Sequence, residues 1–170
     1  VIINYPGRGK LDGLLHEIWD GEPGVPICIV DETLEEIPNI NGLHEKSGSF
    51  HFVRGSALKT ETLQKANVSE CKAVVVYPRE SRVAESDATT KSITDQLSKI
   101  PGNFRVICYI VDVSNLSIFS TTEERYKNAE RPLPIYIPMA LPATLCAQEL
   151  RDPYSAQAII NFSKVNASIN

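Results

Sequence analysis

The stretch that decides the fold is residues 1–9, VIINYPGRG, in which a short apolar run leads into a glycine turn. A helical pattern follows at once, because the apolar residues of Leu11–Trp19 recur at three- and four-residue spacing. We therefore expect Val1–Tyr5 to be a first strand and Leu11–Trp19 to be the helix after it. Strand, glycine turn and helix in this order open a nucleotide-binding α/β unit.

The rest of the chain repeats this alternation of apolar runs and helical patterns. Further strands are expected at Pro26–Val30, Phe50–Arg54, Ala73–Tyr77, Arg105–Val111 and Leu133–Ile137. Helices are expected at Thr33–Ile37, Leu58–Ala66 (with Leu58, Thr62, Leu63 and Ala66 inward), Val83–Ile100, Leu116–Ala129, Pro142–Leu150 and Tyr154–Val165, and Asn39–Ser49 is expected to be an exposed loop. The continuous run Ala73–Tyr77 is typical of a central parallel strand that is buried on both faces. The order predicts a Rossmann-like α/β fold, a doubly wound parallel six-stranded sheet of order 3-2-1-4-5-6.

The two ends of the chain suggest its organisation. We expect a Rossmann-type lobe at residues 1–140 and an element of C-terminal helices at residues 141–170. These last helices have no strand to return to, so we expect them to cross over and pack on another chain or on a following domain. Because the chain starts on a strand residue rather than Met, we also expect it to be part of a longer protein.

Composition narrows the class of partner. The 170 residues carry a formal net charge of −4 and a pI of about 5.4, and no basic stripe favours a nucleic-acid backbone. Apolar runs such as Ala73–Tyr77 are far shorter than the roughly 20 residues of a membrane span. The four cysteines are widely spaced and form no C-x-x-C motif, which is typical of buried, reduced thiols in a cytosolic protein: Cys28, Cys71, Cys108 and Cys146.

The glycine turn is the first candidate binding element. Gly7 and Gly9 supply the first half of the dinucleotide motif, but Asp12 stands where its third glycine is expected, and Pro6 precedes the glycines. Arg8 adds a positive charge that suits a phosphate at a helix N-terminus. A plain strand-to-helix turn is the alternative interpretation.

A carboxylate follows the second strand at a matching distance. Asp31 lies 24 positions after Gly7, close to the roughly 20 expected for the acid that binds ribose hydroxyls. Asp31 could instead cap the segment after it, and the two roles are compatible. The neighbouring Glu32 would repel a 2′-phosphate, so the pattern favours NAD over NADP.

No constellation for catalysis or metal binding is found in the sequence. His16, His44 and His51 are not paired with ligands at metal-binding spacing. There is no G-x-S-x-G elbow and no Tyr-x-x-x-Lys pair. Asp87 and Asp95 lie on the expected long helix and are interpreted as solvated or capping. We therefore expect neither an enzyme nor a metal site.

Several runs together resemble one family. Phe52–Leu58, Leu63–Val68 and Cys71–Val76 are similar to the segment from the third to the fourth strand of RCK domains, the regulators of potassium conductance related to TrkA N-terminal domains. Ser86–Ala88 is similar to the start of the family's next helix, and Pro138–Leu150 to the helix after its sixth strand. The resemblance covers nearly the whole chain in order.

The resemblance also extends the candidate site. It adds Gly55 and Ser56 after the third strand and Pro78 after the fourth, although Ser56 stands where members often carry Asp. The acidic positions of some calcium-gated members fall at Tyr77, Ile110 and Asp112, of which only Asp112 is acidic, so no calcium site is expected.

The function implied by the resemblance is regulation of potassium transport. We expect a regulatory domain at the cytoplasmic face of the membrane, which binds NAD, NADH, another adenine nucleotide or an ion without catalysis. Its partners would be further copies of itself, as a dimer of RCK lobes or a larger gating ring, and a membrane pore or transporter subunit of the same full-length chain. The alternatives are a fragment of an NAD-dependent Rossmann enzyme and a structural oligomerisation module with an empty crevice.

Overall fold

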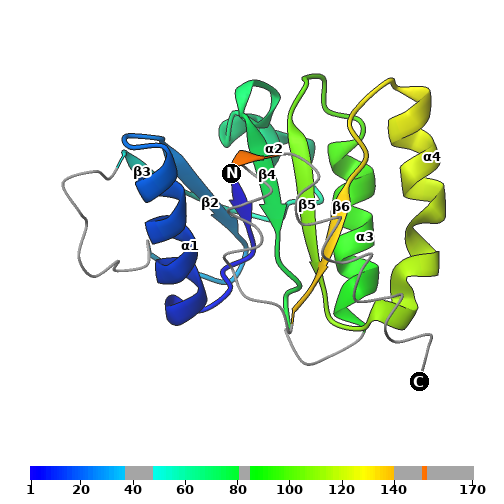
Figure 1. Ribbon diagram of the computed structural model, residues 1–170, viewed down its shortest axis with the longest axis horizontal. Coiled ribbons are helices and arrows are strands. Elements are labelled where there is room, and N and C mark those ends of the chain that lie inside the picture. Colours follow the sequence, from blue (N-terminus) through cyan, green and yellow to red (C-terminus); the bar gives the residue numbers. More distant parts are fainter. Residues whose placement is uncertain (37–47, 81–84, 140–150, 153–170) are drawn as a thin grey trace.

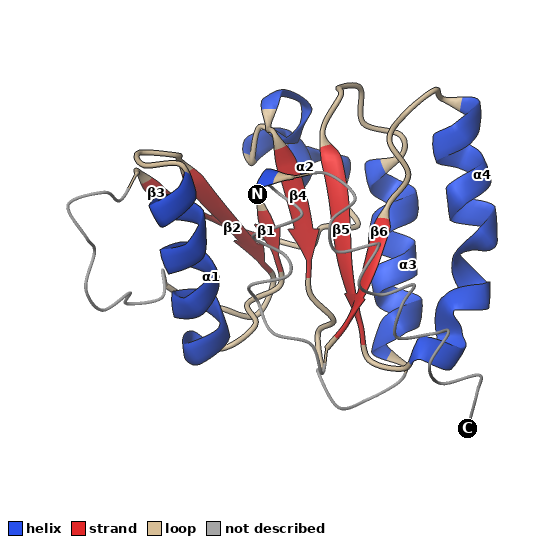
Figure 2. Cartoon of the chain, in the orientation of Figure 1, coloured by secondary structure: helices blue, strands red, loops and turns tan. Residues whose placement is uncertain are grey.

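A computed structural model describes residues 1–36, 48–80, 85–139 and 151–152 (Figures 1 and 2). In chain order the elements are β1 (Ile2–Ile3), α1 (Arg8–Gly21), β2 (Ile27–Asp31), β3 (Phe50–Arg54), α2 (Thr60–Lys65), the 3₁₀ helix η1 (Val68–Glu70), β4 (Ala73–Val76), α3 (Ser86–Leu97), β5 (Arg105–Ile110), the 3₁₀ helix η2 (Val113–Phe119), α4 (Ser120–Asn128) and β6 (Ile135–Pro138). The helices expected at Pro142–Leu150 and Tyr154–Val165 lie outside the described residues, apart from the boundary at 151–152. The structure therefore does not test the division at residue 140.

The six strands form one parallel sheet of order β3-β2-β1-β4-β5-β6, which confirms the predicted fold class and strand order. Ile2 of β1 lies beside Ile29 of β2 on one side and beside Val75 of β4 on the other. The chain winds outward in opposite directions from β1 and β4. The carboxyl ends of these two strands therefore form the switch point, where doubly wound folds bind their ligands.

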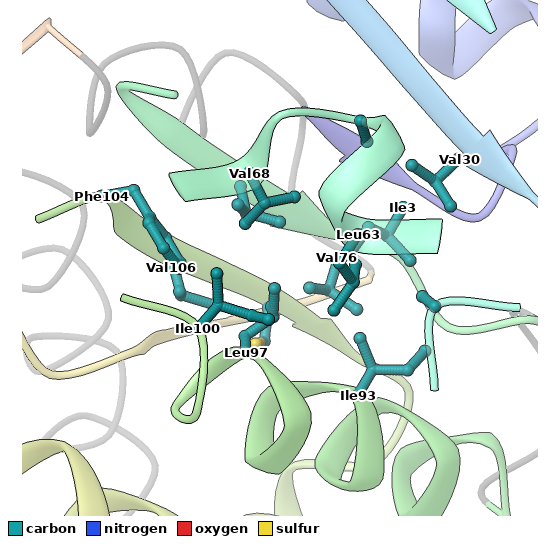
Figure 3. Close-up of a cluster of buried hydrophobic side chains, with 14 of the residues drawn as sticks. Ile3, Val30, Leu63, Val68, Val76, Ile93, Leu97, Ile100, Phe104 and Val106 are labelled. Atoms are coloured by element: carbon teal, nitrogen blue, oxygen red, sulfur yellow. The ribbon is translucent and has the colours of Figure 1, made fainter. Parts of the chain in front are cut away.

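Alternate strand residues feed two separate cores. Val74 and Val76 belong to a core that also contains residues of α2, α3 and α4, whereas Val75 between them belongs to a core with residues of α1 on the other face. Figure 3 shows the first core, with side chains from β1, β2, β4, β5, α2, α3 and the connecting segments in contact. All four residues of β4 are buried, so the prediction of a central strand buried on both faces is confirmed.

Two local predictions are wrong. Thr33–Glu36, the described part of the expected short helix, forms bends instead, because Asp31 binds the first amides of this segment in a turn. Leu58 is 48% exposed rather than inward. The helix α2 begins only at Thr60, so the spacing that put Leu58 on its inner face does not apply to that residue.

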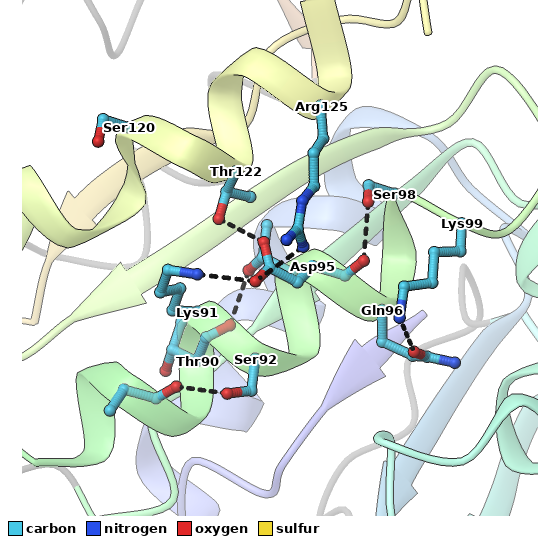
Figure 4. A network of polar contacts seen from close by, with 12 residues as sticks. Thr90, Lys91, Ser92, Asp95, Gln96, Ser98, Lys99, Ser120, Thr122 and Arg125 are labelled. Carbon is cyan, nitrogen blue, oxygen red and sulfur yellow. Dashed lines mark hydrogen bonds and ion pairs between the residues drawn. The ribbon is translucent and has the colours of Figure 1, made fainter. Parts of the chain in front are cut away.

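A charged network joins α3 to α4 (Figure 4). Asp95 of α3 lies 2.7 Å from the Lys91 ammonium and 3.1 Å from the Arg125 guanidinium, and it accepts a hydrogen bond from the Thr122 hydroxyl at 2.5 Å. Burial alone would raise the pKa of the Asp95 carboxyl, but the hydrogen bonds and the two cations outweigh it and lower this pKa. Asp95 thus joins two helices, a role that differs from the solvated or capping role predicted for it.

The three described cysteines are free thiols, with Cys108 fully buried and Cys28 and Cys71 partly buried. Cys146 lies outside the described residues. Across the described ranges, no helix combines the length and apolar character that a bilayer span requires.

Candidate functional site

The predicted site residues all follow carboxyl ends of strands at one edge of the sheet. Pro6 to Gly9 follow β1, Asp31 ends β2 with Glu32 after it, Gly55 and Ser56 follow β3, and Pro78 follows β4. We call this edge, around β1 and β4, the switch point. Three observations describe what these residues do there: the form of the glycine turn, the contacts of Asp31, and an ion pair of Glu32.

In the glycine turn that precedes α1, only the first glycine, Gly7, adopts a backbone conformation that favours glycine. Gly7 has a φ of +88° and precedes the helix, and its carbonyl accepts the Leu11 amide at 3.0 Å. Gly9 lies inside the first turn of α1, where an added Cβ would have no heavy atom within 4 Å. The space above Gly9 is open, as it would need to be for a phosphate to approach the backbone.

The residue in place of the third glycine is a carboxylate with incomplete contacts. Asp12 Oδ2 lies 3.8 Å from Arg8 Nε, and Asp12 Oδ1 is buried without a hydrogen-bond partner among the described residues. Gly13 is exposed and does not take over the role of the missing glycine. In a dinucleotide motif this third glycine lets the helix pack closely on the strand, so α1 departs from the motif here.

Asp31 uses both carboxylate oxygens on its own chain. Its Oδ2 accepts the Tyr5 amide at 2.8 Å, and its Oδ1 accepts the Thr33 amide at 2.7 Å, the Thr33 hydroxyl at 2.8 Å and the Leu34 amide at 2.9 Å. Burial opposes the charged form, but these four hydrogen bonds outweigh it and lower the pKa of the carboxyl. Asp31 thus binds the amides of the segment after it, as foreseen, although this segment forms bends and no helix begins there. Both of its oxygens are already engaged, so a ribose would share them with the chain.

Glu32 pairs with a residue that the sequence did not single out. Its carboxylate forms an ion pair with the guanidinium of Arg79, and each side chain is 47% exposed. Glu32 follows β2 and Arg79 lies in the loop after β4. Neither the charge pattern nor the spacing in the sequence signals this pairing, because the residues lie 47 positions apart.

Gly55, Ser56 and Pro78 have structural roles at the same edge. A Cβ added at Gly55 would lie 2.8 Å from Thr62 Oγ1, so glycine is required for α2 to pack close to the end of β3. The Ser56 hydroxyl accepts the Leu58 amide at 3.4 Å, and Pro78 is buried. The contacts of Gly55 and Ser56 account for these two residues without a ligand.

Asp87, which the sequence analysis interpreted as solvated or capping, is fully buried. Its carboxylate accepts the Val111 amide at 2.7 Å, the Asp112 amide at 3.0 Å and the Asn115 side-chain amide at 2.9 Å. Asp87 thereby ties the start of α3 to the segment that leaves β5. The Ser-Asp pair at the start of a helix after a strand was the only available signal.

Asn4 was also missed, and it joins three strands. It has a φ of +62°, its amide donates to the Val30 carbonyl at 2.9 Å, and its side chain donates to the Tyr77 carbonyl at 2.7 Å. The Tyr77 ring stacks on the Tyr109 ring with centroids 4.5 Å apart. The end of β1 is thus hydrogen-bonded to β2 and to the residue that follows β4.

The chemistry available at the switch point is ionic. Its basic side chains include Arg8 and Arg79, and its acids Asp31 and Asp87 are held by hydrogen-bond donors of the chain. Within the described residues no three His, Cys, Asp or Glu side chains gather where they could hold a metal ion. The arrangement can bind an anion and offers no evident nucleophile with a base.

A cavity lies at the opposite edge, at the amino ends of the strands. Its volume is about 790 Å³, and it is bounded by the start of β1, β2 and β4 and by the ends of α1 and α2. The Lys72 ammonium and the Glu22 carboxylate form an ion pair on its rim. None of the predicted site residues lines this cavity.

Comparison with known proteins supports the resemblance. Residues 20–108 match the model of the calcium-activated potassium channel slowpoke-like RCK domain. The chain is also 30% identical over 122 residues to the "Putative potassium channel protein YugO" of Bacillus subtilis (strain 168). That alignment covers 72% of this chain and 32% of the relative, so the chain spans about a third of that protein's length.

Proposed function

Since the chain belongs to the family of slowpoke-like RCK domains of calcium-activated potassium channels, we propose that it is a regulatory domain that senses a ligand and gates a potassium channel or potassium transporter. It acts at the cytoplasmic face of the membrane and binds a nucleotide or an ion without catalysis. The observation that carries the proposal is the extent of the family match, which runs from the end of α1 to β5. This span covers β2, β3, β4 and most of β5, and it includes the residues around the switch point other than those after β1.

The name of the relative supports the choice of potassium. A protein named as a potassium channel aligns with 72% of this chain and is about three times as long as the aligned part. In the proposed arrangement a pore is formed by other parts of the full-length protein, and several copies of the RCK lobe associate below it as a dimer or a gating ring. Ligand binding then favours one arrangement of the lobes, to the extent that the ligand binds that arrangement more tightly.

The switch point supports a nucleotide, NAD(H) or ADP-like, as the ligand. The Gly7 turn precedes a helix N-terminus, the space above Gly9 is open, and Arg8 and Arg79 supply positive charge. The hydrogen-bonded state of Asp31 and Asp87 supports binding without chemistry, because neither carboxylate is available as a general base.

A melting experiment on the 170-residue chain tests ligand sensing. NAD, NADH, ATP, ADP, Mg²⁺ and Ca²⁺ are added singly at increasing concentration. A ligand at one hundred times its Kd stabilises the fold by about 2.7 kcal/mol, which raises the Tm by about 5–10 °C for a chain of this size. No shift with any of the six would contradict ligand sensing by these compounds.

Potassium flux through vesicles that contain the full-length protein tests the gating role. The ligand that shifts the melting temperature is expected to change the flux, and removal of residues 1–170 is expected to abolish that response. Flux that responds equally with and without the domain contradicts the proposal.

An oligomerisation module with an empty switch point is the second candidate. The observation in its favour is that Asp31 is satisfied by its own chain. It predicts self-association on sedimentation without any ligand-dependent melting shift, so the two experiments together separate the candidates.

A further inference from the structure

We propose that the ion pair between Glu32 and Arg79 is a latch across the switch point, and that a phosphorylated ligand binds by displacing Glu32 from Arg79. This inference rests on the proposed function, because it names the ligand class and the regulation of the same site. It is carried by the strand order, by the contacts of Asp31 and by the charge of Arg79.

The strand order determines what the ion pair must cross. β1 lies between β2 and β4 in the sheet. Glu32 directly follows β2 and Arg79 lies in the loop after β4, so a contact between their side chains passes over the carboxyl end of β1. The Gly7 turn leaves β1 at this position, and here a bound phosphate would meet the helix N-terminus.

The contacts of Asp31 determine which acid the latch can use. Both Asp31 oxygens accept hydrogen bonds from Tyr5, Thr33 and Leu34, so that carboxylate is fixed to its own loop. Glu32 is the next residue and is about half exposed. It is therefore the carboxylate free to extend toward the cation on the far side of β1.

The chemistry of Arg79 determines the ligand. The Arg79 guanidinium contacts Glu32 through one nitrogen, and a guanidinium can bind a phosphate through two parallel hydrogen bonds, so phosphate is the natural competitor of Glu32. An exposed ion pair is weak, because solvent screens both charges, and a phosphate can displace it readily. The latch then raises the apparent Kd of the ligand without preventing binding.

Two sources could supply the phosphate: a nucleotide or a free inorganic phosphate compound. Calorimetric titration with ADP, inorganic pyrophosphate and adenosine at low salt distinguishes them. Binding of ADP alone identifies a nucleotide, equal binding of ADP and pyrophosphate identifies the phosphate group as the whole ligand, and adenosine reports any contribution of the base and ribose.

The test compares three variants with the wild type. Glu32→Gln releases Arg79 and is expected to tighten the binding of the phosphorylated probe by about two- to fivefold, the range that an exposed ion pair represents. Arg79→Gln is expected to weaken it. Glu22→Gln is the matched control, because it breaks the ion pair with Lys72 at the opposite edge of the sheet and should leave the Kd unchanged.

The outcomes separate this inference from the proposed function. Equal Kd values for ADP in wild type, Glu32→Gln and Arg79→Gln overturn the latch and leave nucleotide sensing intact. A lower Kd for ADP in Glu32→Gln together with a higher Kd in Arg79→Gln supports the latch. If no probe binds to any variant, the latch is overturned. The melting shifts with Ca²⁺ and Mg²⁺ then test the proposed function separately. Circular dichroism verifies that each variant is folded.

Discussion

The Oδ2 atom of Asp31 accepts the backbone amide hydrogen of Tyr5 at 2.8 Å, which joins the end of β2 to the segment leaving β1. The other oxygen of the same carboxylate organises the turn at Thr33 and Leu34. One side chain therefore fixes two of the loops that form the switch point. Its position in the sequence is that of a ribose-binding acid, and its contacts are those of a structural one.

Replacement of Asp31 with Asn is expected to destabilise the fold at pH 7 by about 1–3 kcal/mol, because an amide nitrogen cannot accept the hydrogen bonds that Asp31 receives. The Asp31 pKa is lowered from its ordinary value of 3.8 in the folded state. Its contribution is therefore present above that ordinary value and is lost as the pH falls through the folded pKa. Urea unfolding between pH 2 and 7 is expected to show a flatter acid decline for the variant than for the wild type.

Glu124→Gln is the control for Asp31→Asn, because Glu124 is an exposed residue of α4. Its free energy of unfolding at pH 7 is expected to stay within about 0.5 kcal/mol of the wild type. An Asp31→Asn variant with the wild-type decline in acid would show that the four hydrogen bonds do not stabilise the charged carboxylate.

The glycines of α1 give opposite predictions for stability. Gly9→Ala is expected to stabilise the fold by about 0.5–1 kcal/mol, because Gly9 is helical and an added Cβ meets no neighbour. Gly7→Ala is expected to destabilise it by about 1–2 kcal/mol, because Gly7 has a φ of +88°. Thermal unfolding of the two variants measures both effects.

The same glycines test where a nucleotide approaches. A phosphate that contacts the backbone at Gly9 would bind Gly9→Ala more weakly although the fold is more stable. Gly13→Ala is the matched control, since Gly13 is likewise an exposed residue of α1 with open space around it but lies one turn further on. Equal nucleotide affinity in the Gly9 and Gly13 variants would move the ligand away from the glycine turn.

The sheet could be predicted from the sequence because its signals are local. Ala73–Tyr77 is a continuous apolar run, and its strand is buried on both faces as that pattern indicates. The candidate site depended on contacts between distant residues. Whether Asp31 faces a ligand or its own chain is decided by the Tyr5 amide, 26 positions away, and the burial of Asp87 is decided by amides that follow β5. The sequence pattern around Asp31 or Asp87 does not indicate which distant amides bind its carboxylate.

The wrong predictions for Leu58 and Thr33 also arise from structure that the local sequence pattern does not indicate. Leu58 has the spacing of an inward-facing helical residue, but α2 begins at Thr60, so Leu58 lies before the helix and is exposed. Thr33 and its neighbours have a helical composition, yet two hydrogen bonds to Asp31 favour a turn. Side-chain to backbone hydrogen bonds compete with helix formation in just this way.

Arg131 binds backbone carbonyls at the carboxyl end of α3, and its replacement is expected to destabilise the fold. One guanidinium nitrogen donates to the carbonyls of Leu97, Ser98 and Ile100 at 2.9–3.2 Å, and the guanidinium lies 4.4 Å from the centre of the Phe104 ring. Arg131→Lys keeps the charge but loses the planar group that reaches all three carbonyls and stacks on the ring. We expect a loss of about 1–3 kcal/mol in urea unfolding.

Arg125→Lys is the matched control for Arg131→Lys. Arg125 is 52% exposed and its ion pair with Asp95 can be replaced by a lysine, so a change below about 1 kcal/mol is expected. A loss below about 1 kcal/mol in Arg131→Lys as well would indicate that Arg131 stabilises the fold through its charge alone.

Alkylation of the thiols tests the packing of β5. The Cys108 side chain is fully buried, and burial raises its pKa to about 12, although its contact with the Thr94 hydroxyl at 3.1 Å opposes the rise. At pH 8 only about one molecule in ten thousand would carry the reactive thiolate, and the reagent cannot reach it. Iodoacetamide is therefore expected to modify Cys108 only as fast as the protein unfolds. The partly buried Cys28 and Cys71 are expected to react sooner, although burial also raises their pKa and slows them.

Mass spectrometry of digested samples gives the rate for each of the three thiols, and guanidinium-unfolded protein supplies the upper limit for all three. Modification of Cys108 in the native state at the rate of Cys71 would mean that β5 opens locally, and that α3 does not cover it as tightly as its contacts indicate.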